Sequence, residues 1–269
     1  MIVDFHTHVF PDKIAAATVA ALERRGGSPA HSDGTVDGLL LALSRAGADL
    51  AVNLPVLTKP TQFDSILEFA KSINEREYGN ERIISFAGIH PADENIEEHL
   101  LAVRDAGIVG IKIHPDYQGT FFDDERYVRI ISEAKRLGLI VVTHAGFDIG
   151  FRGEEIKCTP TRVLRLLDRV GGYSRLVLAH LGGSELTREV IDTLAGEDVY
   201  FDTAYNLGAV DPSELSELIS KHGAEKILFA TDSPWQNIGR EVKRLSSLGL
   251  SQSELRLIFS ENAKRLLGI

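Results

Sequence analysis

Two histidines stand two positions apart near the start of the chain, in Asp4-Phe5-His6-Thr7-His8. On a β-strand, residues i and i+2 point to the same face. His6 and His8 can therefore present two imidazoles to one small ion, and imidazole binds zinc, copper, iron and nickel. A pair this short indicates a metal site only if further ligands follow along the chain.

Further candidate ligands come at the ends of later predicted strands. His144 ends Val-Val-Thr-His, His180 ends Val-Leu-Ala-His, and Asp232 follows Phe-Ala-Thr. The predicted metal ligands are His6, His8, His144 and Asp232. They would hold one divalent ion, with zinc expected first and manganese or nickel as alternatives. Such an ion lowers the pKa of a bound water to about 7. His180 is then the expected general acid or base, because imidazole titrates near neutral pH, and Asp232 is the second candidate for the proton transfer.

Lys112 and His114 are candidate substrate-binding residues on one predicted strand, Gly110-Ile111-Lys112-Ile113-His114. Period two puts them on one face and leaves the isoleucines to pack against helices. Lys112 is therefore expected to point inward, where an unpaired ammonium is costly. Its expected partner is Asp4 or a substrate carboxylate, and a purely structural ion pair is the alternative. His114 precedes a proline, so it could instead only shape a turn.

The segments after the strands are expected to set specificity. Arg152, in the charged segment 147–157, is a candidate clamp for a substrate carboxylate, although an ordinary solvated loop is the alternative. The aromatic residues Tyr117, Tyr205 and Trp235 are possible pocket walls. Cys158 precedes a predicted helix N-terminus, which can lower a thiol pKa, but a half-buried loop cysteine is the simpler interpretation.

Eight short apolar runs alternate with amphipathic segments such as 123–137. The predicted strands are 2–6, 50–54, 83–89, 109–114, 139–144, 175–180, 199–203 and 226–231. Strands alternating with helices imply parallel strands joined by right-handed crossovers. Eight such units predict an α/β fold, a single (β/α)8 TIM barrel domain over residues 1–269, with an open doubly wound sheet as the alternative. In such barrels the working site lies at the carboxyl ends of the strands, where the candidate ligands stand.

Composition narrows the class of partner. The net charge of −10 argues against a nucleic-acid or anionic-membrane surface, so a small-molecule substrate is expected. Cys158 is the only cysteine, which fits a reducing cytoplasm. No signal-peptide pattern opens the chain, and no apolar run approaches the roughly 20 residues that span a bilayer. A homo-oligomer is compatible with the sequence.

Taken together, the strand-end motifs resemble the amidohydrolase superfamily, most closely its amidohydrolase-2 branch, over the whole chain. The matching motifs are Asp4–His8, Gly110–Pro115, Thr143–Gly146, Ala179–Gly183 and Ala230–Pro234. This branch includes metal-dependent hydrolases and non-oxidative decarboxylases of aromatic or unsaturated carboxylic acids. The resemblance implies the same four metal ligands, with His180 beside the metal. It also implies a single ion, although binuclear superfamily members carry a carboxylated lysine on strand four, where Lys112 lies.

Four functions remain in competition. The leading expectation is hydrolysis of an amide, ester or lactone in a small carboxylated molecule by metal-activated water. The alternative is metal-dependent decarboxylation at the same site. A TatD-like nuclease ranks lower, because that branch is expected to carry a glutamate on strand four where this chain has Lys112. A metal-stabilised binding protein ranks lowest, because structural zinc sites are normally closed and rich in cysteine.

Overall fold

The computed structural model describes residues 1–79 and 81–269. Its strands are parallel to their neighbours throughout and alternate with helices along the chain. The strands are β1 Val3–Thr7, β2 Leu50–Asn53, β3 Ile83–Ser85, β4 Ala87–Gly88, β5 Gly110–Ile113, β6 Ile140–Thr143, β7 Leu176–Leu178, β8 Tyr200–Asp202 and β9 Ile227–Leu228. Each of the predicted strands is present, with ends that differ by a few residues.

The strands close into a barrel. β3 and β4 are two parts of one strand separated by Phe86, whose N–H donates to the Asn53 carbonyl at 2.9 Å. The last strand returns to the first: the Phe5 N–H donates to the Phe229 carbonyl at 2.9 Å, and Thr7 and Ser233 form a parallel bridge. The predicted TIM barrel is therefore confirmed, and the open doubly wound sheet is excluded.

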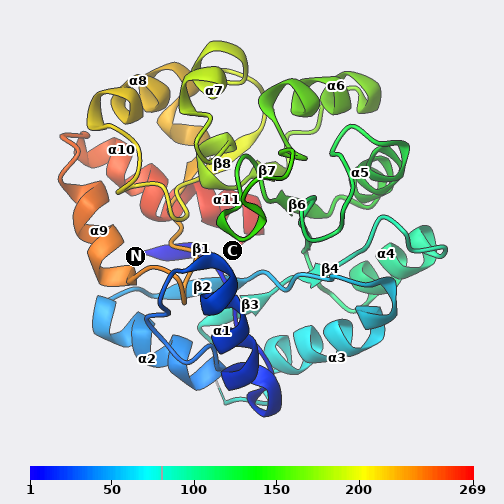
Figure 1. Ribbon diagram of the computed structural model, residues 1–269. Coiled ribbons are helices and arrows are strands. Elements are labelled where there is room, and N and C mark those ends of the chain that lie inside the picture. The colour runs from blue at the N-terminus through cyan, green and yellow to red at the C-terminus, as the bar shows by residue number, and fades with distance from the viewer. Residues whose placement is uncertain (80) are drawn as a thin grey trace.

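Helices surround the barrel in a ring, as Figure 1 shows. They are α1 Asp12–Gly26, α2 Val36–Ala46, α3 Phe63–Asn74, α4 Ile96–Asp105, α5 Glu125–Leu137, α6 Pro160–Val170, α7 Thr187–Thr193, α8 Pro212–His222, α9 Ile238–Ser246, α10 Gln252–Arg256 and α11 Asn262–Leu267. Their ends follow local chemistry: the Thr159 and Ser251 hydroxyls cap α6 and α10, and Gly138 ends α5 in the left-handed conformation. Within the described residues, no helix combines the length and apolar character needed to cross a membrane.

Side chains alternate along each strand between the outside and the inside of the barrel, and this alternation produces two apolar cores. Ile111 and Ile113 of β5 belong to the outer core between barrel and helices, whereas Val142 and Val177 belong to the inner core. Leu266 of α11 packs into that inner core, so apolar side chains fill the interior toward the amino ends of the strands. Polar side chains are left to the opposite end.

Candidate metal centre

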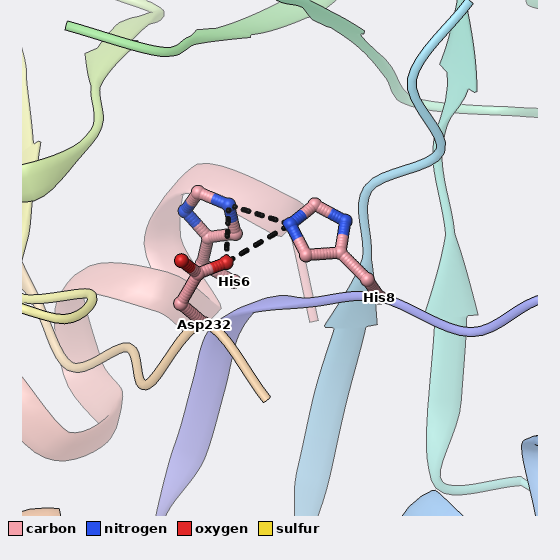
Figure 2. Close-up of side chains that lie close together, drawn as sticks. All are labelled: His6, His8 and Asp232. Carbon is pink, nitrogen blue, oxygen red and sulfur yellow. Dashed lines mark hydrogen bonds and ion pairs between the residues drawn. The ribbon is translucent and has the colours of Figure 1, made fainter. Parts of the chain in front are cut away.

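Three predicted ligands meet at the carboxyl ends of β1 and β9. The Nε2 atoms of His6 and His8 are 3.2 Å apart, and Asp232 Oδ1 lies 3.5 Å from the first and 3.0 Å from the second. Figure 2 shows the two rings and the carboxylate turned toward one another. Asp232 adopts a φ of 65°, a conformation that costs free energy for a residue other than glycine. Its N–H donates to the His6 carbonyl at 2.8 Å, which helps to hold that conformation beside β1.

His6, His8 and Asp232 are called the metal trio below. Hydrogen bonds on the far side of each imidazole ring decide which of its two nitrogens points at the other members of the trio. His6 Nδ1 lies 2.8 Å from Asp202 Oδ2, and His8 Nδ1 lies 2.8 Å from the Leu54 carbonyl oxygen. Both partners are acceptors, so in the neutral rings the hydrogen sits on Nδ1. The lone pairs of both Nε2 atoms then point at each other and at a carboxylate oxygen.

Such converging lone pairs repel one another unless a cation lies among them. Bond lengths of about 2.0–2.1 Å around a tetrahedral zinc ion put its donor atoms about 3.3 Å apart. The spacings of the metal trio, 3.0 to 3.5 Å, are close to that value. The donor set therefore fits a divalent metal ion, and the trio is a candidate His/Asp metal site.

Lys112 points into the barrel, as the strand period predicts, and is 1% exposed. Its Nζ lies 3.3 Å from His6 Nε2, and among the described residues no carboxylate oxygen lies within 4.0 Å of it. Burial lowers the pKa of Lys112 to about 8, against the opposing charges of Asp202 and Asp232. Burial and the Lys112 charge also lower the pKa of His6 well below its ordinary value, which keeps this ring neutral.

The predicted pairing of Lys112 with Asp4 is not formed. The Asp4 carboxylate instead accepts from the Thr231 hydroxyl at 2.5 Å and from the Thr231 and His6 N–H groups at 3.0 and 3.3 Å. It thus joins β1 to the residues after β9. The Lys112 ammonium is left facing the metal trio.

His144, the fourth predicted ligand, is not a member of the metal trio. His180 Nε2 lies 3.0 Å from His144 Nδ1, and the centre of the His180 ring is 5.4 Å from that of His6. His180 thus links His144 to the metal trio. His144 itself is grouped with His114 and Asp148, whose ligand atoms lie within 4.8 Å of one another.

A cavity of about 980 Å³ opens onto this end of the barrel. Its lining includes both histidines of the trio, Asp232, Lys112, His114, His144, His180, Tyr117, Tyr205 and Trp235. The predicted pocket walls therefore border the site. Arg152 follows the short helical turn Ile149–Phe151, lies in the exposed segment 152–155 and does not belong to the lining. Cys158 is fully buried, so the half-buried loop position expected for it is wrong. Burial also raises the pKa of its thiol well above the ordinary value, which disfavours the thiolate that a nucleophile needs.

Two carboxylates of the site were not recognised in the sequence. Asp202 binds His6 from behind, and Asp116 lies 3.8 Å from His144. Asp202 is the last but one residue of the predicted strand 199–203 and shares a face with Tyr200 of the inner core. A carboxylate near the carboxyl end of a strand was therefore the signal that the sequence offered. Asp116 follows a His-Pro turn and carries no comparable pattern.

Solved structures with the same fold include three informative neighbours. A TIM-barrel protein from Bordetella bronchiseptica aligns with a TM-score of 0.80 and 16% identity over 99% of this chain and 98% of its own. A 5-carboxyvanillate decarboxylase from Sphingomonas paucimobilis aligns with a TM-score of 0.70 and 17% identity, over 100% of this chain and 99% of its own. A dihydroxybenzoic acid decarboxylase from Polaromonas, with bound manganese and 2-nitroresorcinol, aligns with a TM-score of 0.73 and 16% identity, over 99% of this chain and 96% of its own. At these identities the agreement shows the fold.

Family membership rests on the sequence itself. No curated protein matches the chain. The model of the amidohydrolase family, in contrast, matches residues 3–269, which includes every motif that carries the resemblance. The protein belongs to the amidohydrolase family.

Proposed function

We propose that this protein is a metal-dependent decarboxylase of a small aromatic or unsaturated carboxylic acid. The observation that carries the proposal is the buried Lys112 ammonium, which lies beside the metal trio without a carboxylate partner within 4.0 Å among the described residues. A buried charge without a partner is costly, and a substrate carboxylate at this position would compensate it. The two decarboxylases named above, which share the fold over nearly their whole length, support this alternative over the hydrolase expected first.

The metal trio would hold the ion, through His6 Nε2, His8 Nε2 and Asp232 Oδ1. A divalent ion, when bound, acts as a Lewis acid that withdraws electron density from a substrate oxygen. The ligand types alone point first to zinc. The manganese ion bound in the Polaromonas decarboxylase supports manganese as the alternative.

The chain's own residues would then orient the acid and move one proton. Lys112 Nζ binds the carboxylate until the carbon–carboxyl bond breaks and carbon dioxide leaves. The bonding electron pair stays on the substrate carbon, which takes up a proton in exchange. His180 would deliver it from Nε2 in its doubly protonated form, in which Nδ1 still donates to the Ala204 carbonyl at 2.9 Å, and Asp232 is the second candidate acid.

Hydrolysis of an amide, ester or lactone is the second candidate. The trio supplies only three protein ligands, and a catalytic zinc with three ligands keeps a position for water. His180 Nε2 would accept the proton of that water. A nuclease remains disfavoured by the net charge of −10.

The test is turnover of metal-loaded protein on paired substrates. Dihydroxybenzoates and 5-carboxyvanillate, each labelled with ¹³C at the carboxyl group, are compared with aryl esters, lactones and amides of similar size. We expect labelled carbon dioxide and the decarboxylated phenol, lost in Asp232→Asn and kept in Glu154→Gln on the exposed segment 152–155. Hydrolysis products without carbon dioxide would establish the second candidate instead.

A further inference from the structure

The cavity that holds the metal trio is larger than a single-ring acid requires. Its volume of about 980 Å³ is at the upper end of the roughly 300–1,000 Å³ typical of pockets that enclose drug-sized ligands. The metal trio and Lys112 form one part of its lining, at the carboxyl ends of the strands. Much of the remaining lining comes from α1 and α3, which the proposed reaction does not use.

On α1, the residues that line the cavity form a stripe. Ile14, Thr18 and Leu22 follow one another at intervals of four residues, which places them on one face of the helix. They span about 12 Å at the helical rise of 1.5 Å per residue. The neighbouring residues Ala15 and Val19 are buried, whereas the Ile14 side chain is 44% exposed. The stripe therefore borders the packed face of α1 and leaves apolar surface open to the cavity.

A second stripe runs along α3. Ile66, Phe69 and Ser72 line the same cavity at intervals of three residues and span about 9 Å. Ile66 and Phe69 also pack in the outer core, so this wall is held in place by the barrel. Both helices lie in the lower half of the view in Figure 1. We call the part of the cavity that the two stripes line the extension.

The extension offers apolar surface and hydroxyl groups, but no buried charge that lacks a partner. Its charged members are exposed, apart from the half-buried Lys71, which pairs with Glu68 at 2.8 Å. In the described part of the chain, no buried polar atom without a hydrogen-bond partner belongs to α1 or α3, whereas His114 and His144 at the metal end carry such atoms. A polar group of a ligand is therefore recognised at the metal end, and the extension suits an apolar group.

The extension is continuous with the metal end of the cavity. Val9 and Phe10 follow His8 in the sequence and belong to the lining. Val56 also belongs to it and comes two residues after Leu54, whose carbonyl holds the His8 ring. Apolar surface thus begins directly beside the metal trio, so a ligand bound there by its carboxylate can place the rest of its carbon skeleton in the extension.

We propose that the substrate is a carboxylic acid with a long apolar tail, such as an alkyl-substituted aromatic acid, and that the tail lies along the stripes of α1 and α3. Its carboxylate takes the position beside Lys112 and the metal trio that the proposed function gives it, and the assignment of the head group rests on that function. Each methylene group that moves from water to an apolar surface improves affinity by up to about fourfold.

The experiment is calorimetric titration of the Mn²⁺-loaded protein with benzoates that carry an unbranched 4-alkyl chain, from methyl to decyl. We expect the dissociation constant to fall about two- to fourfold per methylene until the tail fills the extension. Thr18→Phe and Ser72→Phe each place a ring in the extension, one from each helix, and should reduce this gain. Ala21→Phe, at an exposed position of α1 outside the lining, should keep the parent values. Lys112→Met should weaken every member of the series by a similar factor.

Thermal unfolding checks that each variant is folded. Dissociation constants that do not change with chain length would overturn the proposal. An equal gain per methylene in folded Thr18→Phe, Ser72→Phe and Ala21→Phe would also overturn it, because the tail would then bind elsewhere. Absence of the chain-length effect, together with a dimer that Thr18→Phe dissociates in sedimentation, would assign the extension to a second copy of the chain instead.

These titrations measure binding and not turnover, so the two proposals can fail separately. A chain-length effect without release of carbon dioxide from any acid would support the tail site and count against decarboxylation. Release of carbon dioxide without a chain-length effect would support decarboxylation and overturn the tail site.

Discussion

At the scale of single residues, the site depends on what holds each imidazole from behind. His6 and His8 present Nε2 because Asp202 and the Leu54 carbonyl occupy their Nδ1 atoms. Asp202 also accepts from the His180 N–H at 2.9 Å, so one carboxylate orients a ligand and anchors the neighbouring segment. Such outer partners are expected to matter nearly as much as the ligands.

Asp202→Asn is expected to weaken metal binding about 10- to 100-fold without unfolding the protein, because it weakens the acceptor that fixes the His6 ring. The dissociation constant can be measured by calorimetric titration of the metal-free protein. Asp198→Asn, an exposed carboxylate paired with Lys226 just before β8, is the matched control. Equal affinities in the two variants would contradict the role given to Asp202.

We expect the buried Lys112 ammonium to lower the stability of the folded protein while binding the carboxylate of the substrate. Its pKa falls from 10.5 to about 8 on folding, so the ammonium is disfavoured in the folded state, by about 3 kcal/mol at pH 7. Because the unfolded chain binds this proton more tightly, stability should rise from pH 8 to pH 10.5. Lys112→Met should therefore be more stable than the parent in denaturant at pH 7 with chelator present, yet lose affinity for aromatic carboxylates. A Lys112→Met variant that is less stable than the parent and binds aromatic carboxylates equally well would contradict the role given to this ammonium.

At the scale of elements, the two segments that carry His144 and His180 lie in direct backbone contact. Gly146 and Ser184 form a parallel bridge, and the Ser184 N–H donates to the Ala145 carbonyl at 3.0 Å. Gly146 has a φ of 83°, and a Cβ there would lie 2.1 Å from the Ser184 nitrogen. This contact sets the distance between the two imidazoles.

Gly146→Ala is expected to lower the free energy of unfolding by more than about 2 kcal/mol, because it combines a left-handed conformation with a backbone clash. Gly153→Ala separates the two causes: its φ is 84°, but nothing lies within 4 Å of the added Cβ. This control should lose only about 1 kcal/mol. Equal losses in urea unfolding would show that the close approach of the two segments does not matter.

At the scale of the whole molecule, barrel closure brings the first and last strands together and so assembles the metal trio. The inner core, plugged by α11, leaves the carboxyl ends of the strands as the polar end of the barrel. One buried polar group away from that end supports the packing of a helix on the barrel. His222, at the end of α8, stacks on Phe201 with ring centres 3.8 Å apart and accepts from the Gly196 N–H at 3.2 Å.

His222 should contribute to acid unfolding. Burial lowers its pKa from 6.5 to about 4, so the unfolded chain binds the proton more tightly and stability is lost as pH falls from 6.5 toward 4. The full shift corresponds to about 3 kcal/mol. His222→Gln should show a flatter dependence of unfolding free energy over this range than the parent, whereas His31→Gln, on the exposed surface, should leave it unchanged. A parallel pair of curves for His222→Gln and the parent would contradict this assignment.

The sequence by itself determined the barrel, its strands, the inward direction of Lys112 and the strand-end location of the metal trio. These follow from local periods, because alternation along a strand decides which face each side chain takes. Tertiary structure alone decided which inward side chains meet. Asp4 lies below the metal trio yet accepts from Thr231, Asp202 supports His6 from a strand 196 positions away, and His144 contacts His180. Those contacts depend on barrel register and on hydrogen bonds between strands distant in sequence, which no local pattern records.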